Sequence, residues 1–376
     1  MKNTLRKELI FAQKLIRGCF STPAMRLAIF IISISCIAFL QSCNNSNKPD
    51  FPGYTQFSEQ DFRSSGKLFG SKIANIKLEN PRNISVIDSL IVIVNRNTDY
   101  LLHVYSLKTG KRVNELIRKG KGPHELLSTD YIQKQNKEKK ILVFGTVEKK
   151  VIEFSFDDLL KKPSEIAYTE FSINDQGCLR VVKSGENYIG LTLADSIVKR
   201  LYVYNSKGAM IDAIGDYPSV VPKVGNMLDA VLFEAYHKRL SDGTIALSYS
   251  NMDLIELYDS QYRLQKRLWG PNGVLPSYQL KSKGTYKWVG FKEDQICTYG
   301  DIIPDPMNNE FWVSYSGRKL NDNGYLWSKI FALETSGLFL KRYELDIPML
   351  NMDVDFKSKK IYAITYPELA VYEFKY

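Results

Sequence analysis

The feature that most constrains the fold is a repeat of roughly 50 residues that runs through most of the chain. Short apolar segments recur in the same order. The aromatic residues that end the third strand of four successive repeats, Tyr105, Phe154, Tyr204 and Tyr258, are separated by 49, 50 and 54 positions. A fixed period of this length in a strand-rich sequence is typical of a β-propeller, in which each repeat forms a four-stranded blade that packs between its neighbours.

Six repeats can be counted, and they predict an all-β fold, a six-bladed β-propeller, over residues 64–376. The last repeat supplies only about three strands, so we expect residues 73–78 to complete it and close the ring. An insertion is expected in the fifth repeat at residues 318–327, with a hairpin turn at Asn323-Gly324. The segments that we expect as strands are 90–94, 101–105, 111–117, 140–144, 151–154, 165–171, 188–193, 201–204, 209–214, 244–249, 254–258, 263–269, 311–315, 330–333, 339–345, 360–364 and 370–374.

The N-terminus indicates export. An apolar run of 14 residues, 27–40, follows Arg26. It is shorter than the roughly 20 residues that span a bilayer and has the length of a signal-peptide core. The run leads into Leu40-Gln41-Ser42-Cys43, which resembles a bacterial lipobox because it has an apolar residue at minus three, a small one at minus one, and a thiol that can accept lipid.

We therefore predict a lipoprotein signal peptide at residues 1–42, with Met25 as an alternative start, a tether at residues 43–63, and the propeller at residues 64–376. Lipidation, with acyl chains such as palmitate, is predicted at Cys43, so that the lipid anchors the protein to a membrane. The alternative is an uncleaved anchor helix, which gives the same topology but leaves Cys43 unmodified.

The charge does not favour a nucleic-acid partner. The chain carries a formal net charge of +10, but residues 1–42 hold six basic residues and one acidic residue, a net of +5. The remaining 334 residues therefore carry only +5, with no basic face at helical spacing. We expect a mildly basic, solvated surface and no binding to nucleic acid.

Two cysteines remain beyond Cys43, namely Cys178 and Cys297. They lie far apart and have no CxxC spacing, so they indicate neither a zinc site nor a disulfide framework. We expect two buried free thiols, and one long-range disulfide is the alternative.

The hexapeptide Gly-Lys-Gly-Pro-His-Glu at residues 120–125 ends the first repeat. With the lipobox and the six repeats, it makes the chain resemble the TolB-like six-bladed propeller lipoproteins of Bacteroidota. The resemblance implies a TolB-like or NHL-like propeller in the cell envelope, and it implies no established reaction.

The hexapeptide has two interpretations. In the structural one, which we favour, the two glycines permit positive φ and Glu125 accepts hydrogen bonds from backbone amides of the turn. In the functional one, Arg118, Lys121 and His124 stand with Glu125 at the channel mouth and bind an anionic ligand.

Other chemistry is sparse. The chain has three histidines and lacks the HExxH, GxSxG and GxxxxGK[ST] motifs. Asp353 and Asp355 lie two residues apart on one face of an expected strand and could aim two carboxylates at a metal ion, although solvated charges near a turn explain them better. We expect no cofactor.

Two classes of function remain open. We favour a binding or scaffold module whose loops and channel hold a glycan, a peptide or a protein partner. The alternative is a propeller hydrolase, lactonase or lyase that acts at the central channel. The segment after Cys43 lacks acidic residues, which favours the periplasmic face of the outer membrane over the cell surface.

Overall fold

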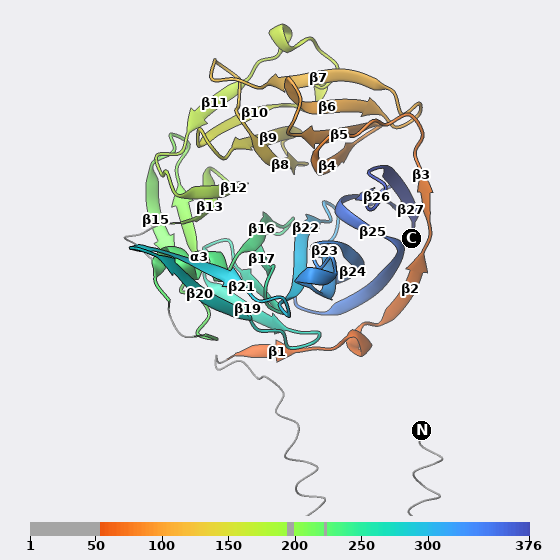
Figure 1. Ribbon diagram of the computed structural model, residues 1–376. Coiled ribbons are helices and arrows are strands. Elements are labelled where there is room, and N and C mark those ends of the chain that lie inside the picture. The colour runs from red at the N-terminus through yellow and green to blue at the C-terminus, as the bar shows by residue number, and fades with distance from the viewer. Residues whose placement is uncertain (1–52, 194–198, 222–223) are drawn as a thin grey trace, which may run out of the picture. The chain divides into compact units, whose positions relative to one another are not determined.

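The computed structural model describes residues 53–193, 199–221 and 224–376, and the predicted signal peptide and Cys43 lie outside these ranges. The described residues form a ring of six blades around a central axis (Figure 1). The fold is almost entirely β, as predicted. No helix in the described part of the chain has the length and apolar character that a membrane crossing requires.

Each blade is an antiparallel meander whose first strand lies nearest the axis (Figure 1). Blades 1 to 4 comprise β4 (Pro81–Ile87), β5 (Leu90–Asn95), β6 (Tyr100–Ser106) and β7 (Arg112–Arg118); β8 (Thr129–Gln135), β9 (Lys140–Gly145), β10 (Lys150–Ser155) and β11 (Thr169–Ser172); β12 (Cys178–Ser184), β13 (Asn187–Thr192), β14 (Leu201–Tyr204) and β15 (Met210–Ile214); and β16 (Ala235–Arg239), β17 (Ile245–Tyr249), β18 (Leu254–Tyr258) and β19 (Leu264–Trp269).

Blades 5 and 6 share one long strand. β25 (Phe339–Asp355) is the outer strand of blade 5 in its first half, where it pairs with β24, and the inner strand of blade 6 in its second half, where it pairs with β26. The strands of the two blades are β22 (Ile296–Pro304), β23 (Glu310–Lys319), β24 (Trp327–Glu334), β25, β26 (Lys360–Thr365), β27 (Val371–Lys375) and β3 (Gly70–Lys72).

The aromatic repeat marks the cores between blades. Tyr105, Phe154, Tyr204 and Tyr258 lie on the third strands β6, β10, β14 and β18, and all four side chains are buried. The apolar pattern predicted the second, third and fourth strands of the blades, except the fourth strand of blade 6, and it missed the first strands. First strands such as β8 carry polar side chains toward the channel, so their hydrophobic alternation is broken.

The N-terminal chain closes the ring, but through a different segment from the one predicted. β3 (Gly70–Lys72) pairs with β27, whereas residues 73–78 form no strand. Ile73, Ile76 and Leu78 instead pack against the core between blades 6 and 1, which accounts for their apolar pattern. Gly70 has no side chain and therefore adds nothing to a hydrophobic pattern. A Cβ at this position would lie 2.7 Å from the ring of Phe374, so the close approach requires glycine.

The same segment forms a belt along three blades (Figure 1). β1 (Tyr54–Gln56) pairs in parallel with β19 of blade 4, and β2 (Ser64–Leu68) pairs in parallel with β25 of blade 5, so the belt begins within the range predicted as a tether. Phe57 stacks on Phe339, with 4.5 Å between ring centroids. Phe62 lies against Phe331 at 4.9 Å.

An ion pair fixes the belt between these rings. The Glu59 carboxylate accepts hydrogen bonds from Lys329, at 2.5 Å, and from Arg342. Burial alone would raise the pKa of Glu59, but the two cations outweigh it and lower that pKa. The belt is therefore held by backbone pairing, aromatic packing and a charge cluster.

Two insertions leave the ring. The one predicted at residues 318–327 is present between β23 and β24, and Asn323 adopts a left-handed conformation there with φ 51°. The other was not predicted: a two-stranded hairpin, β20 (Tyr278–Lys283) and β21 (Tyr286–Phe291), follows blade 4 and lies against the short helix α3 (Asn226–Leu232).

The belt supports the stability of the whole ring. We expect Phe57→Ala to lower the free energy of unfolding by about 3 kcal/mol, because the buried ring leaves a cavity against Phe339. The matched control is Phe69→Ala in the same belt, where the side chain is 69% exposed and its removal should change little. Urea unfolding measures both, and equal midpoints for the two variants would show that the belt is dispensable.

Candidate functional site: an axial channel with two chambers

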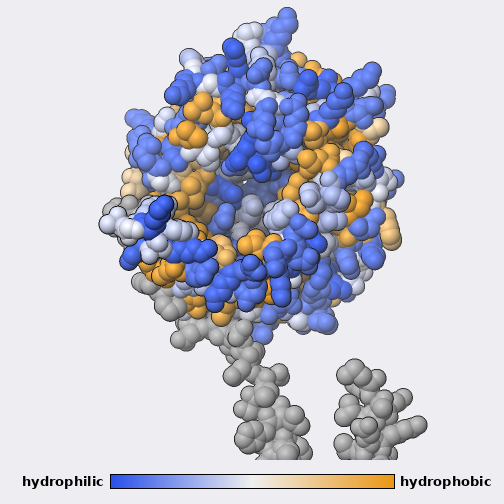
Figure 2. Space-filling model, in the orientation of Figure 1, coloured by the Kyte–Doolittle hydropathy of each residue, from blue (hydrophilic) through white to orange (hydrophobic). Residues whose placement is uncertain are grey.

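The first strands of the blades enclose a channel on the axis of the ring. Figure 2 shows the face of the molecule hollowed at its centre, with hydrophilic residues around the opening. The channel consists of two cavities of about 370 and 320 Å³. Asn83, Lys238 and Asp301 line both cavities, so they form a waist between two chambers of one channel.

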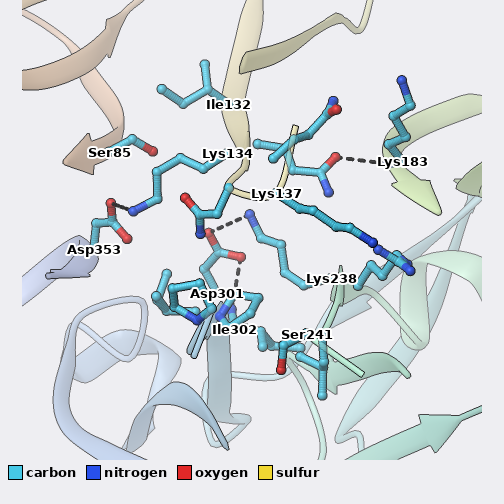
Figure 3. A pocket seen from close by; sticks show the side chains of 18 of the residues that line it. Ser85, Ile132, Lys134, Lys137, Lys183, Lys238, Ser241, Asp301, Ile302 and Asp353 are labelled. Carbon is cyan, nitrogen blue, oxygen red and sulfur yellow. Dashed lines mark hydrogen bonds and ion pairs between the residues drawn. The ribbon is translucent and has the colours of Figure 1, made fainter. Parts of the chain in front are cut away.

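The larger cavity, here called the basic chamber, carries an excess of positive charge. Five cationic side chains line it against three carboxylates, a net charge of +2. Its charged residues are Lys134, Lys137, Lys183, Lys238, Arg239, Glu138, Asp301 and Asp353. Figure 3 shows lysines from several inner strands around one space.

Three of these lysines occupy the same place in the repeat. Lys134, Lys183 and Lys238 are each the last but one residue of an inner strand, in β8, β12 and β16. They are separated by 49 and 55 positions, close to the 50 and 54 positions that separate the buried aromatic residues of the same blades. The basic character of the chamber is therefore built into three successive blades.

These lysines have carboxylate partners. The Lys134 ammonium lies 2.5 Å from Asp353 of blade 6 and 3.1 Å from the Val86 carbonyl of blade 1 (Figure 3). This side chain therefore connects blade 2 to blades 1 and 6. Lys238 lies 3.5 Å from Asp301 of the next blade. Lys183 pairs with Glu153 at 3.2 Å.

Two other cations of the chamber have no carboxylate partner among the described residues. Lys137 is exposed in the turn after β8, and Arg239 is half-buried at the end of β16. Gln135, buried beside them, donates from its amide to Glu153, and its own Oε1 has no partner in the described part of the chain. These groups are available to an anion or a hydrogen-bond donor that enters the chamber.

The smaller cavity, here called the aromatic chamber, is built around Arg180. The guanidinium lies over the rings of Tyr236, at 4.4 Å, and Tyr131, at 5.3 Å. Burial raises the pKa of Tyr236 to about 12, although Arg180 opposes the shift. Burial lowers the pKa of Arg180, but the facing Tyr236 and Tyr131 outweigh it, so the guanidinium stays charged.

The remaining lining of the aromatic chamber adds partly exposed rings and more cations. Trp327 meets Tyr236 edge to face, with centroids 6.3 Å apart, and Tyr325 is 46% exposed. The charged residues of this chamber are Arg82, Arg96, Arg180, Lys238, Asp130 and Asp301, a net charge of +2. Counting the shared residues once, the whole channel has eight cations and four carboxylates.

His237, the histidine of the channel lining, is neutral. Burial lowers its pKa to about 3, and its Nε2 donates a hydrogen bond to the Ile189 carbonyl at 2.9 Å. That bond leaves Nδ1 as the acceptor of the ring, and Nδ1 has no partner in the described residues. His237 therefore adds no charge at physiological pH.

The hexapeptide lies away from the channel. Glu125 accepts a hydrogen bond from the Gly122 amide at 2.9 Å, and a Cβ on Gly120 would lie 2.0 Å from the same carboxylate. His124 contacts Glu170 on the outer strand β11 and stacks on Tyr168. Arg118, Lys121, His124 and Glu125 are absent from the lining of both chambers. Their role in ligand binding stays a prediction.

The two carboxylates predicted as metal ligands have different partners. Asp353 is buried in the basic chamber against Lys134, whereas Asp355 accepts hydrogen bonds from the amides of Lys357 and Ser358 in a turn. Within residues 53–193, 199–221 and 224–376, no three His, Cys, Asp or Glu side chains gather in a way that could hold a metal ion. Cys178 and Cys297 are free thiols.

Most channel residues were missed because the inner strands were missed. A signal was nevertheless present, since Lys134, Lys183 and Lys238 follow the period of the aromatic residues. Counting back 49 positions from Lys134 leads to Ser85, which lines the same chamber in blade 1. A search for polar residues at the repeat period would therefore have located one wall of the channel.

The fold and the channel define a six-bladed propeller with a polar axis. A family model described as "TolB-like 6-blade propeller-like" matches residues 56–357. The chain therefore belongs to the TolB-like six-bladed propeller family. No curated protein matches the chain by sequence.

Two solved structures are similar to the chain. A member of the DUF4221 family from Bacteroides vulgatus is 9% identical, with a TM-score of 0.52, over 88% of this chain and 98% of that one. Virginiamycin B lyase from Staphylococcus aureus is 10% identical, with a TM-score of 0.45, over 82% of this chain and 99% of that one. The likeness to the first of these shows the fold alone.

We expect the ion pair between Lys134 and Asp353 to stabilise the fold. We expect Asp353→Asn to lower the free energy of unfolding by about 3 kcal/mol, because it leaves the mostly buried Lys134 ammonium without its counterion. Adding Lys134→Met should recover part of the loss, because it removes the stranded charge. Urea unfolding of the single and double variants measures this coupling.

Asp355→Asn is the matched control, since its carboxylate serves only a surface turn, and it should cost less than about 1 kcal/mol. Additive effects of Asp353→Asn and Lys134→Met would contradict the pairing. A stabilisation by divalent metal that both aspartate variants abolish would instead support the metal site predicted from the sequence.

Proposed function

We propose that this protein is an envelope lipoprotein, held by lipid on Cys43, whose propeller is a binding module for an anionic ligand in its axial channel. The ligand carries carboxylate or phosphate groups and comes from a glycan, a peptide or a protein surface. The observation that carries the proposal is the lining of the channel, which has eight cations against four carboxylates.

The two chambers would bind different parts of the ligand. In the basic chamber, Lys137 and Arg239 have no carboxylate partner among the described residues and can accept a new one without breaking an ion pair. In the aromatic chamber, Trp327 and Tyr325 offer partly exposed rings of the kind on which sugar or peptide groups pack. The paired lysines keep the channel walls in place while the unpaired cations take the ligand.

Ligand binding should appear as stabilisation of the propeller. We expect a thermal shift with an oligogalacturonate or an acidic peptide, and none with a neutral oligosaccharide of the same length. A ligand at a hundred times its dissociation constant stabilises the folded state by about 2.7 kcal/mol. The double variant Lys137→Gln/Arg239→Gln should weaken binding roughly tenfold, because it removes both unpaired cations.

The matched control is Lys108→Gln/Lys111→Gln, which removes the same charge from an exposed turn of blade 1 and should bind as the parent does. Equal shifts with acidic and neutral ligands would contradict charge recognition. Breakdown of the added ligand during the experiment would redirect the proposal to a propeller hydrolase, lactonase or lyase.

The anchor can be tested separately. We expect Cys43→Ser to abolish incorporation of labelled palmitate and to leave a precursor that keeps residues 1–42, since the thiol is the acyl acceptor. Ser42→Ala, which retains a small residue before the cysteine, should be processed normally. A parent protein that begins upstream of Cys43 and takes up no label would favour an uncleaved anchor helix.

We place the anchored propeller on the periplasmic face of the outer membrane. The sequence after Cys43, Asn44-Asn45-Ser46-Asn47-Lys48, supports this placement because it lacks acidic residues. Protease added to intact cells should leave the protein whole. Its degradation under those conditions would move the proposal to the cell surface.

A further inference from the structure

The hairpin β20–β21 presents two unlike faces. Its strands pair antiparallel from Tyr278 opposite Phe291 to Lys283 opposite Tyr286, so side chains alternate between the faces. Tyr278, Val289 and Phe291 belong to one face and pack against the core of blades 3 and 4. On the opposite face, Gln279, Lys281, Lys283 and Tyr286 are exposed and Trp288 is partly exposed.

That outward face combines aromatic rings with lysines. Lys281 lies opposite Trp288, and Lys283 lies opposite Tyr286. The rings of Tyr286 and Trp288 stack at 5.8 Å, and Tyr286 is 69% exposed. The stem of Lys281 lies across Gly290, where a Cβ would approach it to 2.9 Å, which places the stem beside Trp288.

The hairpin is also strongly basic. Residues 278–291 contain Lys281, Lys283 and Lys287 and no aspartate or glutamate. All three lysines are exposed, and none forms an ion pair with another described residue. The hairpin thus combines lysines that have no carboxylate partner with a stacked tyrosine and tryptophan. Side chains of these types anchor proteins at the lipid headgroup region of a membrane.

The hairpin projects from the blade on which the N-terminal belt begins. β20 follows β19 of blade 4, and β1 pairs with that same β19 from Tyr54 onward (Figure 1). Ten residues, 44–53, separate the proposed lipid site at Cys43 from Tyr54, and this stretch can span no more than roughly 40 Å. A lipid on Cys43 would therefore keep blade 4 within reach of the membrane surface.

We propose that the outward face of β20–β21 docks on an anionic lipid surface and orients the propeller on the membrane that anchors it. This inference rests on the proposed anchorage for its biological setting. Tyr286 and Trp288 enter the headgroup region, and Lys281 and Lys283, which share their face, meet lipid phosphates. The lipid bilayer is favoured over a glycan because the same blade receives the short tether.

The test uses residues 49–376, which form one compact unit with their own cores, so that acylation plays no part. The probe is a set of phosphatidylcholine vesicles with an increasing fraction of phosphatidylglycerol, assayed by sedimentation. We expect binding that grows with phosphatidylglycerol and falls with salt. We also expect a blue shift of tryptophan emission that Trp288→Phe removes.

The decisive variant is Lys281→Gln/Lys283→Gln, since Lys287 lies opposite Ser282 on the other face of the hairpin. Each lysine near an anionic surface contributes about 1 kcal/mol, so the double variant should bind about thirtyfold more weakly. The matched control is Lys108→Gln/Lys111→Gln, which removes two exposed lysines from blade 1 and should bind as the parent does. The channel variant Lys137→Gln/Arg239→Gln should also bind vesicles normally, which separates this test from that of the channel.

The proposal is overturned if the parent fails to bind the vesicles, or if the hairpin variant binds as well as the parent. It is also overturned if the same lysines and Trp288 prove to bind a soluble oligogalacturonate in preference to vesicles. Loss of a dimer in the hairpin variant, seen by sedimentation velocity in the absence of vesicles, would assign the face to a second copy of the chain instead.

Discussion

The structure depends on the packing of each blade between two neighbours. A four-stranded sheet with two apolar faces is stable only when both faces are covered, and a row of blades satisfies this condition at its ends only by closing into a ring. Here the final blade lacks its outer strand until β3 adds to β27. The belt that carries β3 has already paired with blades 4 and 5, so one continuous segment holds three of the six blades.

Closure also explains why the channel is polar. The inner strands surround the axis and leave two cavities of about 370 and 320 Å³, and charged side chains are ordinarily the ones that stay in contact with solvent. The pair of Lys134 with Asp353 bridges two blades that are not adjacent in the ring, and the pairs of Lys183 with Glu153 and of Lys238 with Asp301 join neighbouring blades. Such buried pairs add little net stability, but separating one member from the other is costly, so they favour a single arrangement of the inner strands.

The repeat of apolar residues along the sequence predicted the blades, whereas the repeat of polar residues that line the channel was missed. Tyr105 and its counterparts marked the blades because their burial needs aromatic rings at a fixed period. Lys134 and its counterparts have nearly the same period, but a lysine in a strand is ordinarily a solvent-facing residue. The closing strand was misplaced by a few residues for a related reason. Gly70 pairs its backbone beneath Phe374, and backbone pairing leaves no hydrophobic pattern.

The basic sites of the molecule fall into two groups, according to whether their cations already have carboxylate partners. Lys134, Lys183 and Lys238 have carboxylate partners, so an anion must compete with Asp353, Glu153 or Asp301 to reach them. Lys137 and Arg239 face no such competition within the described residues, and the same is true of the hairpin lysines. An unpaired cation near the surface stays hydrated until an anion replaces the water. An anion that binds there breaks no existing ion pair, so the free-energy cost of binding is lowest at these places. The rim of the channel and the hairpin of blade 4 are therefore where an anionic partner gains the most.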